Sequence, residues 1–138
     1  MITSLVLFQI TIIFLLGGAL FGLFSRNVRL ARPMIFVPTM IGSIFTIIFS
    51  VYTIMGEPFT WTIPNTIPFV NFEILVDGIA SFFLLIIGIV SFAVSLYSIG
   101  YSKEYEVKKR TSALGFLFNM FILSMVLVVV SNNAFFFL

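Results

Sequence analysis

The chain has 138 residues, of which 61% are hydrophobic and 9% are charged, with a formal net charge of +2. A soluble domain needs many more charged side chains to cover its surface, so this composition excludes an ordinary soluble protein. There is no Cys and no His, which excludes disulfides, thiolate metal sites and haem ligation by His within the chain. We expect a protein that is embedded in the lipid bilayer.

The charged residues leave four uncharged stretches of at least 24 residues, at 1–25, 33–56, 78–102 and 111–138. About 20 residues at about 1.5 Å per residue cross a hydrocarbon core of about 30 Å. The sequence therefore predicts an all-α membrane protein, with a single membrane domain over residues 1–138. Its four transmembrane helices are expected at about 5–24, 34–55, 79–101 and 113–130.

The Lys and Arg residues lie in two short segments, between the first two predicted helices and between the last two. They are Arg26, Arg29, Arg32, Lys103, Lys108, Lys109 and Arg110. Because positive charge marks cytoplasmic loops, we expect both segments on the cytoplasmic side of the cell (inner) membrane. Both chain termini are then expected on the outer side. Charges confined to two loops form no nucleic-acid-binding face, so we expect no nucleic acid partner. The N-terminus lacks a basic n-region and a small-residue cleavage site, which indicates a retained first helix.

Small and polar residues in the first two helices suit close packing. Gly18 and Gly22 form a G-x-x-x-G pair, which serves either generic helix packing or one specific helix partner. Pro33 predicts the start of the second helix, because its missing N–H would be unpaired there anyway. The polar residues within that helix can bond back to its own backbone; they are Ser43, Thr46 and Ser50.

The segment 56–77 predicts a small β-hairpin. Apolar and other residues alternate from Val70 to Val76, which is the pattern of a half-buried strand. Its predicted partner strand is Trp61–Ile63, with Asn65 in the turn between them. We expect this hairpin on the outer face of the membrane, with Trp61 at the level of the lipid headgroups.

Asp77 is a candidate functional residue at the start of the third helix. Its carboxylate is placed to accept backbone N–H bonds as a helix cap. The alternative is a carboxylate that handles protons at the membrane surface. At the other end of this helix, Tyr97, Tyr101 and Tyr105 recur one turn apart and predict an aromatic belt at the interface.

The last part of the chain supplies the second candidate residue. Residues 102–112 pair Glu104 with Lys108 and Glu106 with Arg110 at i, i+4 spacing, which predicts a short surface helix. Asn119 is the strongly polar residue of the fourth helix, and we expect it to hydrogen-bond between helices. The apolar run at 134–138 is expected to begin a fifth helix that docks against another polypeptide.

The four predicted helices contain no Asp, Glu, Lys, Arg or His. Ionisable residues inside a membrane mark ion and proton pathways, so we expect no transport by this chain alone. The sequence also has no phosphate-binding loop, nucleophile–base arrangement or metal-ligand cluster. We expect a chain that is not catalytic alone and binds no flavin, iron–sulfur cluster, haem or nickel.

Several motifs in the second half of the chain occur together in one family. They read V-D-G-I-A at Val76–Ala80, Y-S-I-G-Y at Tyr97–Tyr101 and F-N-M-F at Phe118–Phe121, followed by S-M and a final N-A-F-F-F-L. Through them, Glu73–Leu138 resembles the start of the antiporter-like proton-translocating membrane subunits. These subunits occur in NADH dehydrogenase (complex I), cation/proton antiporter complexes and membrane-bound hydrogenases. The segments Ser-Phe-Phe-Leu and Tyr-Ser-Ile-Gly-Tyr are most similar to the formate hydrogenlyase/hydrogenase branch of this family.

This resemblance implies a role within a larger membrane oxidoreductase complex. The family places its proton-path Glu on a fifth helix and its Lys residues on later helices, and no residue here matches those positions. We therefore expect an N-terminal scaffold portion of such a subunit, from a split gene or a truncated product. Its expected partners are lipid and other membrane subunits, including a chain that supplies the later helices. The alternative is a free-standing four-helix accessory or assembly protein.

Overall fold

A computed structural model describes residues 2–24, 28–56, 58–67, 70–101 and 108–132. In these ranges the elements are the helices α1 (Ile2–Phe24), α2 (Val28–Met55), α3 (Gly78–Tyr101) and α4 (Lys108–Val130), and the strands β1 (Phe59–Ile67) and β2 (Val70–Val76). All four helices contain segments long and apolar enough to cross a membrane, at Thr3–Gly22, Ile35–Met55, Gly78–Gly100 and Ala113–Val130. The prediction of four such helices is confirmed.

Two helices begin earlier than the sequence predicts. α2 starts at Val28, so Pro33 lies inside the helix and does not start it. Pro33 removes one backbone hydrogen bond, to the carbonyl of residue 29, and that carbonyl lies outside the apolar segment, where water can replace the bond. α4 starts at Lys108 because Lys and Arg are good helix formers, whereas hydropathy finds only the apolar part of a helix. The predicted pairs Glu104–Lys108 and Glu106–Arg110 each include a residue outside the described ranges. The predicted fifth helix at 134–138 also lies outside them.

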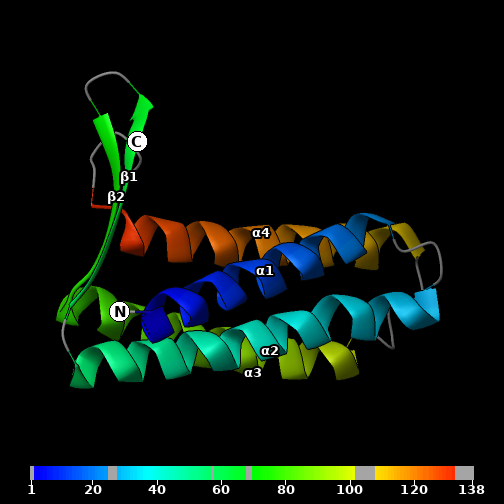
Figure 1. The fold of residues 1–138 in the computed structure, drawn as a ribbon. Coiled ribbons are helices and arrows are strands. Elements are labelled where there is room, and N and C mark those ends of the chain that lie inside the picture. Colours follow the sequence, from blue (N-terminus) through cyan, green and yellow to red (C-terminus); the bar gives the residue numbers. More distant parts are fainter. Residues whose placement is uncertain (1, 25–27, 57, 68–69, 102–107, 133–138) are drawn as a thin grey trace.

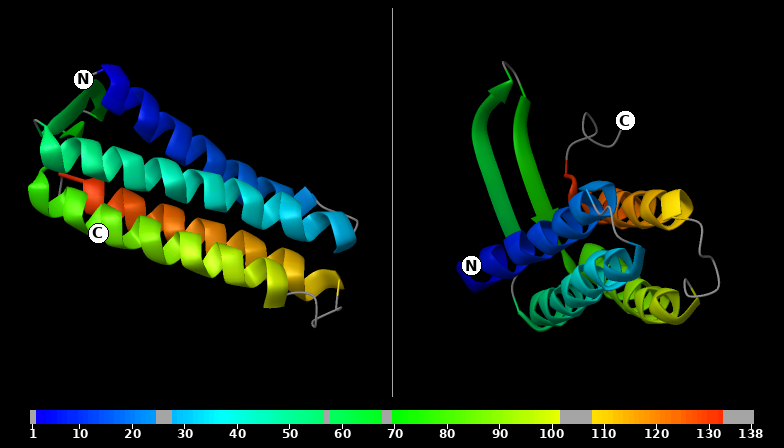
Figure 2. Two further views of the ribbon diagram at one scale, coloured as in Figure 1. Left: turned by 90° about the horizontal axis from the view of Figure 1, so that it is seen from below. Right: turned by 90° about the vertical axis from the view of Figure 1, so that its right-hand side faces the viewer.

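The four helices run alternately up and down and form one bundle (Figure 1). α2 packs along both α1 and α3, and α4 packs against α1, α2 and α3. The start of α1, the end of α2, the start of α3 and the end of α4 lie at one end of the bundle, together with the hairpin. The ends of the helices that flank 25–27 and 102–107 lie at the opposite end (Figure 2). The helix ends that carry Arg29 and Arg32 of α2 and Lys108–Arg110 of α4 are thus on the side away from the hairpin.

The hairpin between α2 and α3 crosses the end of the bundle at a steep angle to the helices (Figure 1). β1 and β2 are antiparallel, with Phe59 opposite Val76 and Trp61 opposite Ile74. The prediction that Asn65 lies in the turn is wrong, because β1 continues through Asn65 to Ile67. The register shifts between Ile63 and Ile67, and this irregularity accommodates Pro64, which cannot donate a ladder hydrogen bond.

The base of the hairpin is part of the buried core. Ile74 and Val76 are buried and Leu75 between them is half-buried, in agreement with the alternation in the sequence. Phe59 of β1 lies 5.8 Å from Phe49 of α2 and 6.4 Å from Phe8 of α1, measured between ring centroids. These three rings therefore join the hairpin to two helices by aromatic contacts.

One contact lies between β2 and the residue that follows α4. Ile74 of β2 forms an isolated antiparallel bridge with Ser131, directly after the last residue of α4. Ile74 also pairs with Trp61 of β1, so its two sides meet two different parts of the chain. The end of α4 is thereby fixed to the hairpin.

Candidate functional site

Asn119 lies completely buried where α4 meets α1 and α2. The Thr39 hydroxyl of α2 donates to Asn119 Oδ1 at 2.6 Å. Asn119 Nδ2 in turn donates to the carbonyl of Gly115, one turn earlier in α4, at 2.9 Å. Asn119 therefore makes the hydrogen bond between helices that the sequence predicts, and its amide is satisfied on both sides.

The Thr39 hydroxyl has two acceptors within reach. Its Oγ1 lies 2.9 Å from the Ile35 carbonyl of its own helix as well as 2.6 Å from Asn119 Oδ1. A hydroxyl carries one proton, so these two oxygens share or exchange it. Thr39 consequently keeps a partner even when Asn119 is removed, which limits the stability that this single bond contributes.

Two glycines make room for this junction. A Cβ atom on Gly18 of α1 would stand 2.7 Å from Asn119 Oδ1 and 3.0 Å from the Ile35 carbonyl oxygen. A Cβ on Gly115 would clash with the side chain of the fully buried Ile35. Small residues let membrane helices approach closely, and here they allow three helices to meet at one amide. The predicted role of Gly18 in close packing thus has partners within this chain.

A column of buried hydroxyls continues from Thr39 along α2. Each hydroxyl donates to the backbone carbonyl four residues earlier; the residues are Thr39, Ser43, Thr46, Ser50 and Thr53. Their spacing of four and three residues keeps them on one face of the helix. Gly88 of α3 packs against this face, because a Cβ there would lie 3.3 Å from the Ser43 carbonyl oxygen. The column is a tightly packed helix seam with its donors satisfied locally.

Asp77 has the geometry of a helix N-cap. Its Oδ1 accepts the backbone N–H of Ala80 at 2.7 Å, and its carbonyl accepts the N–H of Ser81 at 2.9 Å. The Ser81 hydroxyl donates to the same carbonyl at 2.7 Å. α3 starts at the next residue, Gly78, so the carboxylate also lies at the positive end of the helix dipole.

Substitution of Asp77 separates this capping from proton handling. Asp77→Asn should leave the stability of the purified chain nearly unchanged, whereas Asp77→Ala should cost about 1 kcal/mol, because Asn can cap and Ala cannot. Thermal unfolding of both variants in one detergent measures this difference. If both variants assemble normally but equally reduce proton pumping by the larger complex that the sequence resemblance implies, the carboxylate handles protons.

Asp77 and Asn119 are not brought together by the fold. Asp77 directly follows β2, which is bridged to Ser131 at the end of α4. Asn119 lies twelve residues before Ser131, or about 18 Å along the helix. Among the described residues, no three His, Cys, Asp or Glu side chains are grouped as metal ligands. The arrangement around Asn119 holds helices together and offers neither a nucleophile nor a proton carrier.

Sequence reasoning missed two residues of this junction. Thr39 precedes Ser43 by one turn and continues the same helical face, so its spacing was an available signal. Gly115 precedes Asn119 by four residues, which was a second signal for the same reason. Neither spacing identifies which helix Asn119 contacts, because Thr39 and Asn119 are 80 residues apart.

Comparison with known proteins gives two matches, each to part of the chain. Residues 61–111 match the family described as NADH-ubiquinone oxidoreductase (complex I), chain 5 N-terminus. A second match is 40% identical over 70 residues to "Hydrogenase-4 component B" of Escherichia coli (strain K12). That match covers 51% of this chain and 10% of the relative. The predicted resemblance to antiporter-like subunits, and to their hydrogenase branch, is confirmed.

Proposed function

We propose that this membrane protein is the N-terminal, four-helix scaffold portion of an antiporter-like subunit in a membrane-bound hydrogenase or NADH dehydrogenase complex. The observation that supports it most is the 40% identity to a hydrogenase-4 component over half of the chain. The family match at 61–111 covers most of the hairpin, the Asp77 cap and α3. In this proposal the helices pack beside the proton-conducting part of the complex, which other polypeptide segments provide.

The neutral interior of the bundle supports a scaffold role. None of the four apolar segments contains an Asp, Glu, Lys, Arg or His. The buried polar side chains within them are hydroxyls and the Asn119 amide, and neither group ionises near neutral pH. Proton translocation through a membrane protein uses ionisable side chains along its path. The proposed complex must therefore place those side chains outside these four helices.

Purified chain in liposomes should consequently show no proton or cation/proton exchange above that of empty liposomes. An interior pH dye and an imposed pH or sodium gradient measure this. The matched control is the same preparation with gramicidin added, which shows that the vesicles are sealed and that the dye responds. Exchange that depends on this chain alone would contradict the scaffold role.

The loop charges support an orientation within the membrane. The helix ends next to 25–27 and 102–107 lie at the end of the bundle opposite the hairpin, and in the sequence all Lys and Arg residues lie within or close to these two segments. The positive-inside rule then places that end in the cytoplasm, and the hairpin and both chain termini outside.

Cysteine labelling tests this orientation directly, because the chain has no native Cys. Thr62→Cys, on the exposed surface of β1, should react with an impermeant maleimide added to intact cells. Glu106→Cys should react only after the membrane is opened. Labelling of both positions from the same side would contradict the four-span arrangement.

A further inference from the structure

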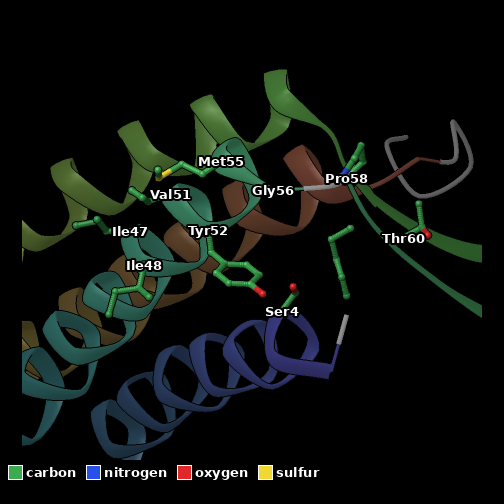
Figure 3. A pocket seen from close by; sticks show the side chains of 10 residues that line it. Ser4, Ile47, Ile48, Val51, Tyr52, Met55, Gly56, Pro58 and Thr60 are labelled. Atoms are coloured by element: carbon green, nitrogen blue, oxygen red, sulfur yellow. The ribbon is translucent and has the colours of Figure 1, made fainter.

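A pocket of about 750 Å³ opens at the hairpin end of the bundle, between α1, α2 and β1 (Figure 3). Most of its wall is apolar and comes from the last turns of α2, including Ile48, Val51 and Met55. Pro58 and Phe59 close it on the hairpin side. Among the described residues that line it, the side-chain polar groups are the hydroxyls of Ser4, Tyr52 and Thr60, and none of these residues is charged.

The Ser4 hydroxyl is the first donor in this pocket. Ser4 is only 5% exposed, and among the residues that the structure describes its hydroxyl has no hydrogen-bond partner. The other buried hydroxyls of α1 and α2 each donate to a backbone carbonyl, as Thr11 does to Leu7. Ser4 stands in the first turn of α1 and has no such carbonyl four residues before it. Buried polar groups normally have a partner, so this hydroxyl can take an acceptor that the described residues do not supply.

Tyr52 is the second donor, on the facing helix. Figure 3 shows the Tyr52 ring reaching toward α1, with its hydroxyl directed to the same part of the pocket as that of Ser4. The first backbone N–H groups of α1 lie at the same level and have no carbonyl partner within the helix. A hydrogen-bond acceptor at this point would therefore meet donors from two helices.

The position of the pocket along the bundle defines what can occupy it. The apolar segments of α1 and α2 start and end here, at Thr3 and Met55, so the hydroxyls lie at the boundary between hydrocarbon and headgroups. From this level the exposed side chains of Val51, Ile48 and Ile44 continue down α2 toward the middle of the bundle. An occupant must combine a long apolar chain with neutral acceptor oxygens at one end.

We propose that this pocket binds one membrane phospholipid. Its acyl chain lies along the exposed face of α2, and an ester carbonyl oxygen accepts hydrogen bonds from Ser4 and Tyr52. Since the described lining residues carry no charge, binding depends little on the charge of the headgroup. The lipid would fix the start of α1 to the end of α2 beside the base of the hairpin.

Native mass spectrometry of the full chain, released from a mild detergent with added phosphatidylcholine, tests this proposal. The wild type should retain one phospholipid per chain. The double variant Ser4→Ala/Tyr52→Phe removes both donors with little change in shape, and should weaken retention by about tenfold or more. The control Ser124→Ala/Tyr97→Phe makes the same chemical changes at exposed positions of α4 and α3, and should retain lipid like the wild type.

A second titration tests whether the charge of the headgroup contributes to binding. Phosphatidylglycerol should bind within about threefold of phosphatidylcholine, because none of the described lining residues carries a charge that would distinguish them. Circular dichroism should show equal helicity for all variants, so that a loss of lipid is not a loss of fold. Equal retention by the donor variant and the wild type would overturn the proposal. A similar loss in the control pair, or displacement of the phospholipid by an equimolar short-chain quinone, would overturn it too.

Discussion

Replacing Gly18 by Ala should destabilise the helix bundle by about 2–3 kcal/mol, which is large for the addition of one methyl group. The new Cβ would stand 2.7 Å from Asn119 Oδ1 and 3.0 Å from the backbone oxygen of Ile35. The oxygen of Ile35 belongs to the α2 backbone and cannot rotate away. α1 must therefore shift outward, which loosens its contacts with both α2 and α4.

Gly17→Ala is the matched control, because a Cβ there meets nothing within 4 Å. It should be neutral or slightly stabilising, by up to about 1 kcal/mol, since Ala is the better helix former. Unfolding in mixed micelles, followed by circular dichroism, gives both values. A double-mutant cycle adds Asn119→Ala, which alone should cost about 1 kcal/mol. The cost of Gly18→Ala should be smaller in that background, and equal costs for Gly17→Ala and Gly18→Ala would contradict the described junction.

Phe49→Ala should cost about 2–3 kcal/mol, because it removes the ring that lies between Phe8 of α1 and Phe59 of β1. Phe49 is 1% exposed, so the deletion leaves a cavity at the base of the hairpin. The cost is below that of a large soluble-core deletion, since lipid is as apolar as the core and only packing is lost. The hairpin should also become more accessible to protease in the variant.

Phe121→Ala on α4 provides the comparison. Its side chain is 61% exposed in the bundle and would face lipid, so the substitution should cost less than about 0.5 kcal/mol. Thermal unfolding of the two variants in the same detergent measures the difference. If Phe121→Ala is the more damaging change, that face of α4 contacts a partner and the core assignment at Phe49 carries less of the stability.

Hydropathy predicts the helices of this protein well and their ends poorly. A run of apolar residues long enough to cross a bilayer usually forms an α-helix, because a helix satisfies all its backbone hydrogen bonds internally. All four helices were therefore predictable. The early start of α2 was not, because Pro33 is also compatible with the interior of a helix outside the membrane. The early start of α4 was not predictable either, because its first residues are charged and hydropathy identifies only apolar helix segments.

The hairpin and the candidate site show a second limit, which is set by contacts between distant residues. Alternation along β2 is a local signal and was read correctly, whereas the turn was placed at Asn65, inside the irregular part of β1. The cap at Asp77 is also local and has the geometry expected from its position. The bridge between Ile74 and Ser131 and the bond between Thr39 and Asn119 depend on how the helices pack, and no spacing in the sequence encodes those pairs.

Co-purification from native membranes tests the scaffold role most directly. A tag on the chain, expressed at its natural level, should recover membrane subunits of one hydrogenase or NADH dehydrogenase complex, including a polypeptide that carries intramembrane Lys and Glu residues. Gly18→Ala should lower the recovery of these subunits, because it destabilises the bundle. Gly17→Ala should recover them as the wild type does. Recovery of the chain alone, as a stable protein with no such subunits, would contradict this account and favour a free-standing four-helix accessory protein.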